Sequence, residues 1–81
     1  MGRLRVLSGR DVLKILREFG FEPYAQRGSH MKVRRILENG ATQTLTVPNH
    51  VEIDRVTLHA IYRQACRYIP ESSLHDKFFT G

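Results

Sequence analysis

Residues 30–48 read HMKVRRILENGATQTLTVP, and the turn at their centre sets the pattern of the fold. Asn39-Gly40 is the strongest short-range signal for a β-hairpin, because both residue types accept the positive φ that a tight turn requires. Apolar and polar side chains alternate on both sides of the turn, which is typical of strands with one buried face. The stretch therefore predicts antiparallel strands over residues 30–37 and 42–48, the second ending at Pro48.

A capped helix is predicted earlier in the chain, over residues 8–21, SGRDVLKILREFGF. Ser8 and Asp11 fit a capping box, in which each side chain accepts a hydrogen bond from the other residue's backbone N–H. Apolar residues recur at the spacing of one buried helix face: Val12, Ile15, Leu16 and Phe19. Gly20 can adopt the left-handed backbone conformation that ends a helix, and the Phe21 side chain can fold back onto the last turn.

The segment between this helix and the hairpin predicts a short first strand over residues 21–26, FEPYAQ. Pro23 has no N–H to donate to a neighbouring strand, so this strand is expected at an edge of the sheet. A turn over residues 27–29, RGS, connects it to the second strand.

A second helix is predicted after the hairpin, with Asp54 as its N-cap and Pro70 at its end. Its buried face carries Leu58, Ile61, Tyr62, Ala65 and Ile69. The tail, residues 70–81, predicts one short helix capped by Ser73, whose apolar side would be formed by Leu74, Phe78 and Phe79. The alternative is a partly ordered end.

These elements predict an α+β fold with the order α-β-β-β-α. Both helices are expected on one face of a three-stranded antiparallel sheet, so that the other face is open to water. A length of 81 residues favours a single domain over residues 1–81, with a core over about 8–69 and a tail over 70–81.

Side chains alternate along a strand, so the sequence also predicts which of them face the helices. The buried set is Met31, Val33, Leu37, Leu45 and Val47. The outward set is His30, Lys32, Arg34, Thr42, Thr44 and Thr46. On the first strand, Tyr24 is expected outward, with Phe21 and Ala25 inward. Arg35 breaks the alternation and Ile36 falls outside, which a bulge or an early end of the strand could explain.

The open face is therefore basic, rich in hydroxyl groups and supplied with one imidazole. The net charge of +5 and the sequence pI near 10.0 favour anionic partners, nucleic acid first. Arg27, at the rim of this face, adds to the cations, which can hold phosphates. The aromatic ring of Tyr24 can stack on an unpaired base, and histidine can transfer protons near neutral pH. Gly28 permits a tight turn, and Ser29 can donate to a phosphate or hold the imidazole. The alternative is an ordinary solvated sheet face.

Composition excludes several other classes of protein. No apolar run approaches the ~20 residues that span a bilayer, and no signal peptide is recognised at the N-terminus. Cys66 is the only cysteine, so it forms no internal disulfide, which is consistent with a reducing cytosol. The four histidines are scattered without paired ligand spacing, so no metal and no cofactor are expected.

A basic stripe runs along the second predicted helix. Its members recur every four residues: Arg55, His59, Arg63 and Arg67. It is interpreted as a solvated face, an acidic partner's contact surface or a contact for a second RNA segment.

Three stretches together resemble the HicA-type mRNA interferase toxins. They are SGRDVLKILREFGFEPYAQRGSHMKV, then TVPNH, then TLHAIYRQA, over about residues 8–66. Chains of this family are small and basic, and carry RGSH, a hairpin, VPxH and a closing helix in this order. The resemblance implies a fold like that of double-stranded-RNA-binding domains, which agrees with the order predicted above.

The resemblance also implies a cytoplasmic, metal-independent nuclease that cleaves mRNA and is neutralised by a HicB-type antitoxin. The family's catalytic histidine maps onto His30, Gly28 and Ser29 match the same motif, and His50 matches the histidine of VPxH. A non-catalytic RNA-binding module of the same fold is the alternative. A homodimer formed through the tail is also left open.

RNA cleavage without a metal needs the 2′-OH deprotonated and the leaving 5′-oxygen protonated. His30 is expected to take the first proton. The donor of the second is open among Tyr24, Lys32, His50 and water, and phosphate holding is assigned to Arg27, Lys32 and Arg34.

Overall fold

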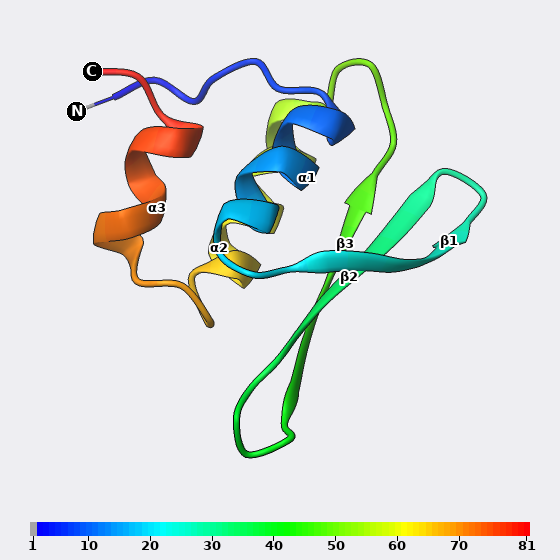
Figure 1. The fold of residues 1–81 in the computed structure, drawn as a ribbon. Helices are drawn as coiled ribbons and strands as arrows, with labels where there is room; N and C mark the ends of the chain where they lie inside the picture. The colour runs from blue at the N-terminus through cyan, green and yellow to red at the C-terminus, as the bar shows by residue number, and fades with distance from the viewer. Residues whose placement is uncertain (1) are drawn as a thin grey trace.

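The computed structural model describes residues 2–81 and confirms the predicted order of elements (Figure 1). The elements are α1 (Gly9–Glu18), β1 (Glu22–Arg27), β2 (His30–Ile36), β3 (Thr42–Pro48), α2 (Arg55–Ala65) and α3 (Glu71–Phe78). The strands form one antiparallel sheet in the order β1-β2-β3, so β1 is an edge strand as predicted. The fold is α+β, α-β-β-β-α, followed by a third helix.

Helices α1 and α2 cover one face of the sheet, and α3 lies beside these helices, away from the strands (Figure 1). Four of the predicted inward residues, Met31, Val33, Leu45 and Val47, are buried, and Val33 and Val47 have no exposed surface. The fifth, Leu37, lies just after the end of β2 and is only half-buried. The four buried residues pack in one apolar cluster with residues of α1 and α2, for example Leu16 and Leu58. On the opposite face Arg34 is exposed, so that face is open to water as expected.

Helix α1 begins and ends as its sequence predicts. The backbone N–H of Asp11 donates to Ser8 Oγ at 3.0 Å, and the backbone N–H of Ser8 donates to Asp11 Oδ2 at 2.9 Å. The second bond holds the pKa of Asp11 below its ordinary value. Gly20 has φ +92°, and the backbone N–H of Phe21 donates back to the Leu16 carbonyl at 3.1 Å, which is a Schellman ending.

The second half of the chain differs from the prediction at two helix boundaries. Helix α2 begins after Asp54 as expected but ends at Ala65, well before Pro70, because the chain tightens into a turn in which the Tyr68 N–H bonds the Ala65 carbonyl. Ser73 is not an N-cap: α3 begins at Glu71, directly after Pro70, whose fixed φ suits a helix start. Within residues 2–81, no helix combines the length and the apolar composition that crossing a membrane requires.

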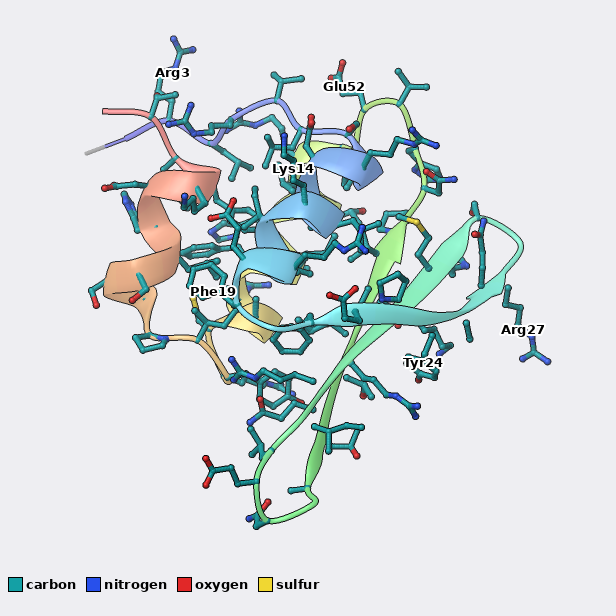
Figure 2. All side chains as sticks on the ribbon, in the orientation of Figure 1. Arg3, Lys14, Phe19, Tyr24, Arg27 and Glu52 are labelled. Atoms are coloured by element: carbon teal, nitrogen blue, oxygen red, sulfur yellow. The ribbon has the colours of Figure 1, made fainter. Side chains whose placement is uncertain are left out.

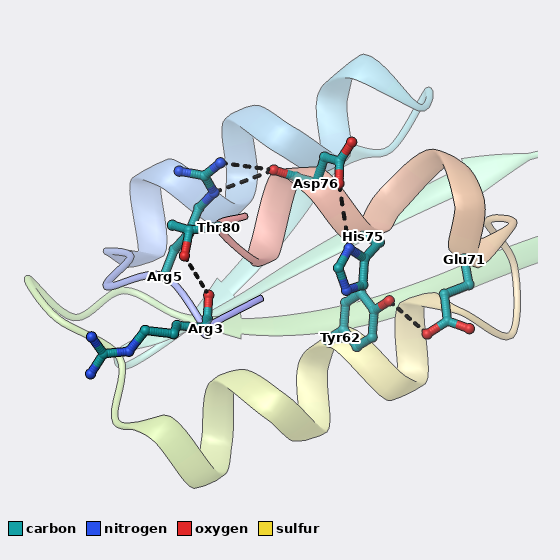
Figure 3. A network of polar contacts seen from close by, with 7 residues as sticks. All are labelled: Arg3, Arg5, Tyr62, Glu71, His75, Asp76 and Thr80. Carbon is teal, nitrogen blue, oxygen red and sulfur yellow. Dashed lines mark hydrogen bonds and ion pairs between the residues drawn. The ribbon is translucent and has the colours of Figure 1, made fainter. Parts of the chain in front are cut away.

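The tail is an ordered part of the fold, tied to α2 and to the N-terminal segment (Figure 3). The Arg5 N–H donates to the Phe78 carbonyl at 2.7 Å, and the Tyr62 hydroxyl donates to Glu71 at 2.9 Å. Burial raises the pKa of Tyr62 well above its usual value. Leu74 and Phe78 are fully buried in the chain's own core, so a dimer formed through this tail would have to use its exposed side.

Arg35 is the main departure from the predicted strand pattern. The β2–β3 ladder runs without a bulge to Ile36, so neither the proposed bulge nor an early strand end occurs. Arg35 instead points to the core side, half-buried, with its guanidinium 4.9 Å from the Phe21 ring centroid. It donates to the Phe19 carbonyl at 2.9 Å and to the Tyr68 carbonyl at 2.8 Å. Gln43 accepts two further bonds, so this cation is satisfied in place.

A bulge does occur, but in β1. Pro23 pairs with Val33, and the next paired residue is Ala25, opposite Lys32. Ala25 therefore shares the register of the open face, which corrects its expected inward position. Tyr24 lies in the bulge and faces outward as predicted, under the Arg34 guanidinium at 4.6 Å.

Removing the Arg35 guanidinium is expected to loosen the contact between sheet and helices. We expect Arg35→Met to lower the free energy of unfolding by about 2–3 kcal/mol, because hydrogen bonds from a charged group are lost and the Phe19 and Tyr68 carbonyls lose a partner. Urea unfolding followed by circular dichroism measures this. Arg34→Met, one residue earlier on the exposed face, serves as the control and should cost less than about 1 kcal/mol. Equal losses in the two variants would contradict the assignment.

Candidate functional site

The turn before β2 fixes the position of His30. Arg27 and His30 are paired across the β1–β2 hairpin, with Gly28 and Ser29 between them. Gly28 has φ +58°, as the first central residue of a type II′ turn requires, and no atom would lie within 4 Å of an added Cβ. Glycine is therefore needed here for its backbone conformation and not for space.

The loop after β3 is held against this turn and against α1. The Asn49 N–H donates to the Ser29 carbonyl at 2.6 Å, which extends the ladder beyond the His30–Pro48 pair. The Gly9 N–H donates to the His50 carbonyl at 2.8 Å. Gly9 is buried, and a Cβ there would overlap the Pro48 carbonyl oxygen. These contacts hold the His50 backbone beside the turn that carries His30.

His30 and His50 line one groove at the free edge of β3. The groove is an open hollow of about 290 Å³ between the sheet and α2. Its lining consists of His30, Thr46, Pro48, His50, Thr57, Ala60, Ile61 and Gln64. We call it the histidine groove. Both imidazoles are exposed to solvent, so a dissolved substrate can reach them.

The other predicted site residues form two groups. Arg27 and Lys32 flank His30: Arg27 is its partner across the hairpin, and Lys32 is the next residue on the same face of β2. Arg34 lies four residues beyond His30, which is about 13 Å along a strand, and it covers the Tyr24 ring. Figure 2 shows Tyr24 and Arg27 on β1, pointing away from the helices.

Three polar side chains of the groove were not singled out as site residues from the sequence. Thr46 was predicted only to face outward, and Thr57 and Gln64 lie on α2. Their spacing with Ala60 and Ile61 follows one helix face, but no sequence signal shows that this face reaches the sheet edge.

Hydrogen bonds from the Thr57 side chain and backbone hold the pKa of Asp54 below its ordinary value, so the α2 N-cap beside the groove is a stable carboxylate.

The comparisons with known proteins give one match. The family model described as the HicA toxin of bacterial toxin–antitoxin systems matches residues 9–65, from the start of α1 to the end of α2. The matched range contains both histidines of the groove and Gly9. Neither the curated proteins nor the solved structures contain a match to this chain.

Substituting Gly9 is expected to disturb the loop that carries His50. Gly9→Ala places a methyl group against the Pro48 carbonyl, so we expect the free energy of unfolding to fall by about 1–3 kcal/mol. NMR spectra should also show shifted amide resonances at Asn49 and His50. Arg10→Ala, at the next and exposed position of α1, is the control and should leave both quantities nearly unchanged. A fully stable Gly9→Ala protein would show that the close approach is unimportant.

Proposed function

The chain belongs to the HicA toxin family of bacterial toxin–antitoxin systems, and from that premise we propose that it is a metal-independent endoribonuclease that cleaves mRNA. The observation that carries the proposal is the histidine groove, in which His30 and His50 share one solvent-accessible hollow. Arg27 and Lys32 lie beside His30 on the open face and supply positive charge. Two groups that exchange protons, next to cations, suit attack within an RNA phosphodiester.

His30 acts as the general base in this proposal. Its neutral imidazole takes the proton of a ribose 2′-OH, and the resulting oxygen attacks the neighbouring phosphorus. The bond from phosphorus to the 5′-oxygen breaks, which yields a 2′,3′-cyclic phosphate and a 5′-hydroxyl end. Histidine is the usual general base of enzymes that work near neutral pH, because its imidazole can exchange a proton there.

His50 is the general acid that the groove favours. Of the donors left open by the sequence, only His50 lines the same hollow as His30. Tyr24 lies beneath the Arg34 guanidinium and Lys32 is half-buried, and neither side chain lines the groove. A protonated His50 would give its proton to the leaving 5′-oxygen, and a second proton exchange through water would restore both histidines.

The cations divide between two tasks. Arg27 and Lys32 hold the phosphate under attack and offset the charge that develops on its oxygens. Arg34 lies about 13 Å from His30 along β2, and it covers the Tyr24 ring in the β1 bulge. Arg34 and Tyr24 therefore contact a different nucleotide, by a phosphate contact and by stacking. Gly28 and Ser29 position His30 through the turn.

The family membership indicates an antitoxin partner, because such toxins are parts of toxin–antitoxin systems. We propose that this partner is a HicB-type protein and that the two meet in the cytoplasm. A basic open face gives an acidic partner surface a charge-complementary contact.

The nuclease proposal is tested with purified protein and a labelled mRNA fragment in excess EDTA. We expect the wild type to cleave. His30→Gln should lower the rate by about 10²–10⁴-fold, as should His50→Gln, because each variant loses one proton-transfer step. The wild type should give a bell-shaped pH–rate profile that loses one limb in the His50 variant.

His59→Gln is the matched control, because it removes a histidine of α2 that does not line the groove. It should cleave like the wild type. Far-UV circular dichroism should be the same for all the variants. An active His30→Gln protein would overturn the assignment of the base. Tight binding with intact RNA would overturn the nuclease proposal and leave an RNA-binding module.

A further inference from the structure

The histidine groove continues beyond the two histidines along α2. Ala60 and Gln64 line it, and the same two residues line a second hollow that is completed by Arg63 and Arg67. Two hollows that share lining residues adjoin each other. Ala60 has only a methyl side chain, which rises little above the surface of α2 between the two hollows. An extended polymer lying in the groove can therefore pass over α2 to the two arginines.

The two arginines at the far end of this passage carry free positive charge. Both are exposed. The ion pairs within residues 2–81 are Arg17–Glu22, Lys77–Glu18 and His75–Asp76, and none includes Arg63 or Arg67. Arg35, by contrast, is occupied by backbone carbonyls. The guanidinium groups of Arg63 and Arg67 are therefore available to an anion.

The basic stripe of α2 is not one surface. Its first half, Arg55 and His59, lines a separate hollow together with residues of the two chain ends, among them Leu4 and Phe79. His59 also packs edge-on against Phe79, with ring centroids 6.4 Å apart. Only Arg63 and Arg67 adjoin the histidine groove, so the structure separates two residues of the stripe that could serve the reaction from two that could not.

The chemistry of this end of the passage suits nucleic acid better than protein. Its lining is three long polar side chains and one methyl group, with no aromatic or large aliphatic anchor. Protein interfaces have an apolar core, whereas arginine pairs bind phosphates through two parallel hydrogen bonds each. Arg63 lies in the last turn of α2 and Arg67 in the turn that directly follows it, in which the Arg67 N–H donates to the Gln64 carbonyl at 3.1 Å. Both side chains line one hollow, so they can hold neighbouring phosphates of one strand.

We propose that Arg63 and Arg67 form a phosphate-binding track for single-stranded RNA on one side of the scissile bond, with Gln64 at its junction with the histidine groove. This inference rests on the proposed nuclease function. The track does not touch the reacting atoms. It raises the affinity for those RNA strands whose length is sufficient to reach from the histidine groove to Arg63 and Arg67.

The test compares a long and a short substrate. The long one is a mixed-sequence, fluorescently labelled, single-stranded oligoribonucleotide, and the short one is the dinucleotide that matches its cleavage site. For the double variant Arg63→Gln/Arg67→Gln, we expect kcat/KM to fall about 10–100-fold on the oligonucleotide and to stay unchanged on the dinucleotide. A plot of the logarithm of the association constant for the oligonucleotide against the logarithm of the salt concentration should become less steep by about 1.4, the value for two lost phosphate contacts on a single strand.

The matched control is Arg10→Gln/Lys14→Gln, which removes the same charge from α1, where both residues line a different hollow. It should keep most of the activity on both substrates. The inference is overturned if the control falls as far as the track variant, if the dinucleotide is affected equally, or if the oligonucleotide is cleaved normally. Loss of antitoxin affinity with unchanged RNA kinetics would also overturn it and would assign the arginines to an acidic protein.

Failure of the nuclease proposal is distinguishable from failure of the track. If the wild type cleaves neither substrate, the nuclease proposal is wrong. Fluorescence anisotropy of the oligonucleotide with wild type, track variant and control then still decides whether Arg63 and Arg67 bind RNA. Wild-type affinity in the track variant would overturn the track in that case as well.

Discussion

The guanidinium of Arg35 joins the sheet to the ends of both long helices. The Phe19 carbonyl at the end of α1 has no partner within that helix and receives a hydrogen bond from this side chain. The Tyr68 carbonyl, in the turn that follows α2, receives another. Gln43 on β3 holds the same group from the side. Because one rigid, planar cation reaches all three neighbours, the C-terminal ends of α1 and α2 are held at a fixed position over β2.

The histidine groove is a consequence of that arrangement. Helix α2 is held beside the free edge of β3, so its polar face approaches the outward residues Thr46 and His30. At the other end of α1, Gly9 lets the helix start touch the backbone after β3, and this contact holds His50 in place. The site thus combines a hairpin turn, a loop and a helix face, and each of these is positioned by backbone hydrogen bonds or close packing.

Local signals in the sequence predicted the elements well and some boundaries poorly. The capping box at Ser8, the left-handed stop at Gly20 and the Asp54 cap all involve neighbours within a few residues, so the sequence displays them directly. The end of α2 and the start of α3 are set by a local turn and by Pro70, but the apolar spacing of residues 58–69 and the presence of Ser73 pointed elsewhere. Only the role of Arg35 depends on partners far along the chain. Arg35 looked like a fault in the alternation because its partners Phe19 and Tyr68 lie 16 and 33 residues away.

The amino-acid order alone was enough for the α-β-β-β-α pattern and for the open basic face, because periodicity and turn chemistry are local properties. The RGSH motif is local as well, and it is the basis on which His30 is proposed as the central residue. The placement of His30 and His50 in one groove, and the division of the basic stripe into two surfaces, needed the folded chain. Those relations depend on the twist of the sheet and the placement of α2 beside β3. Both are set by packing between distant segments, which no short stretch of sequence specifies.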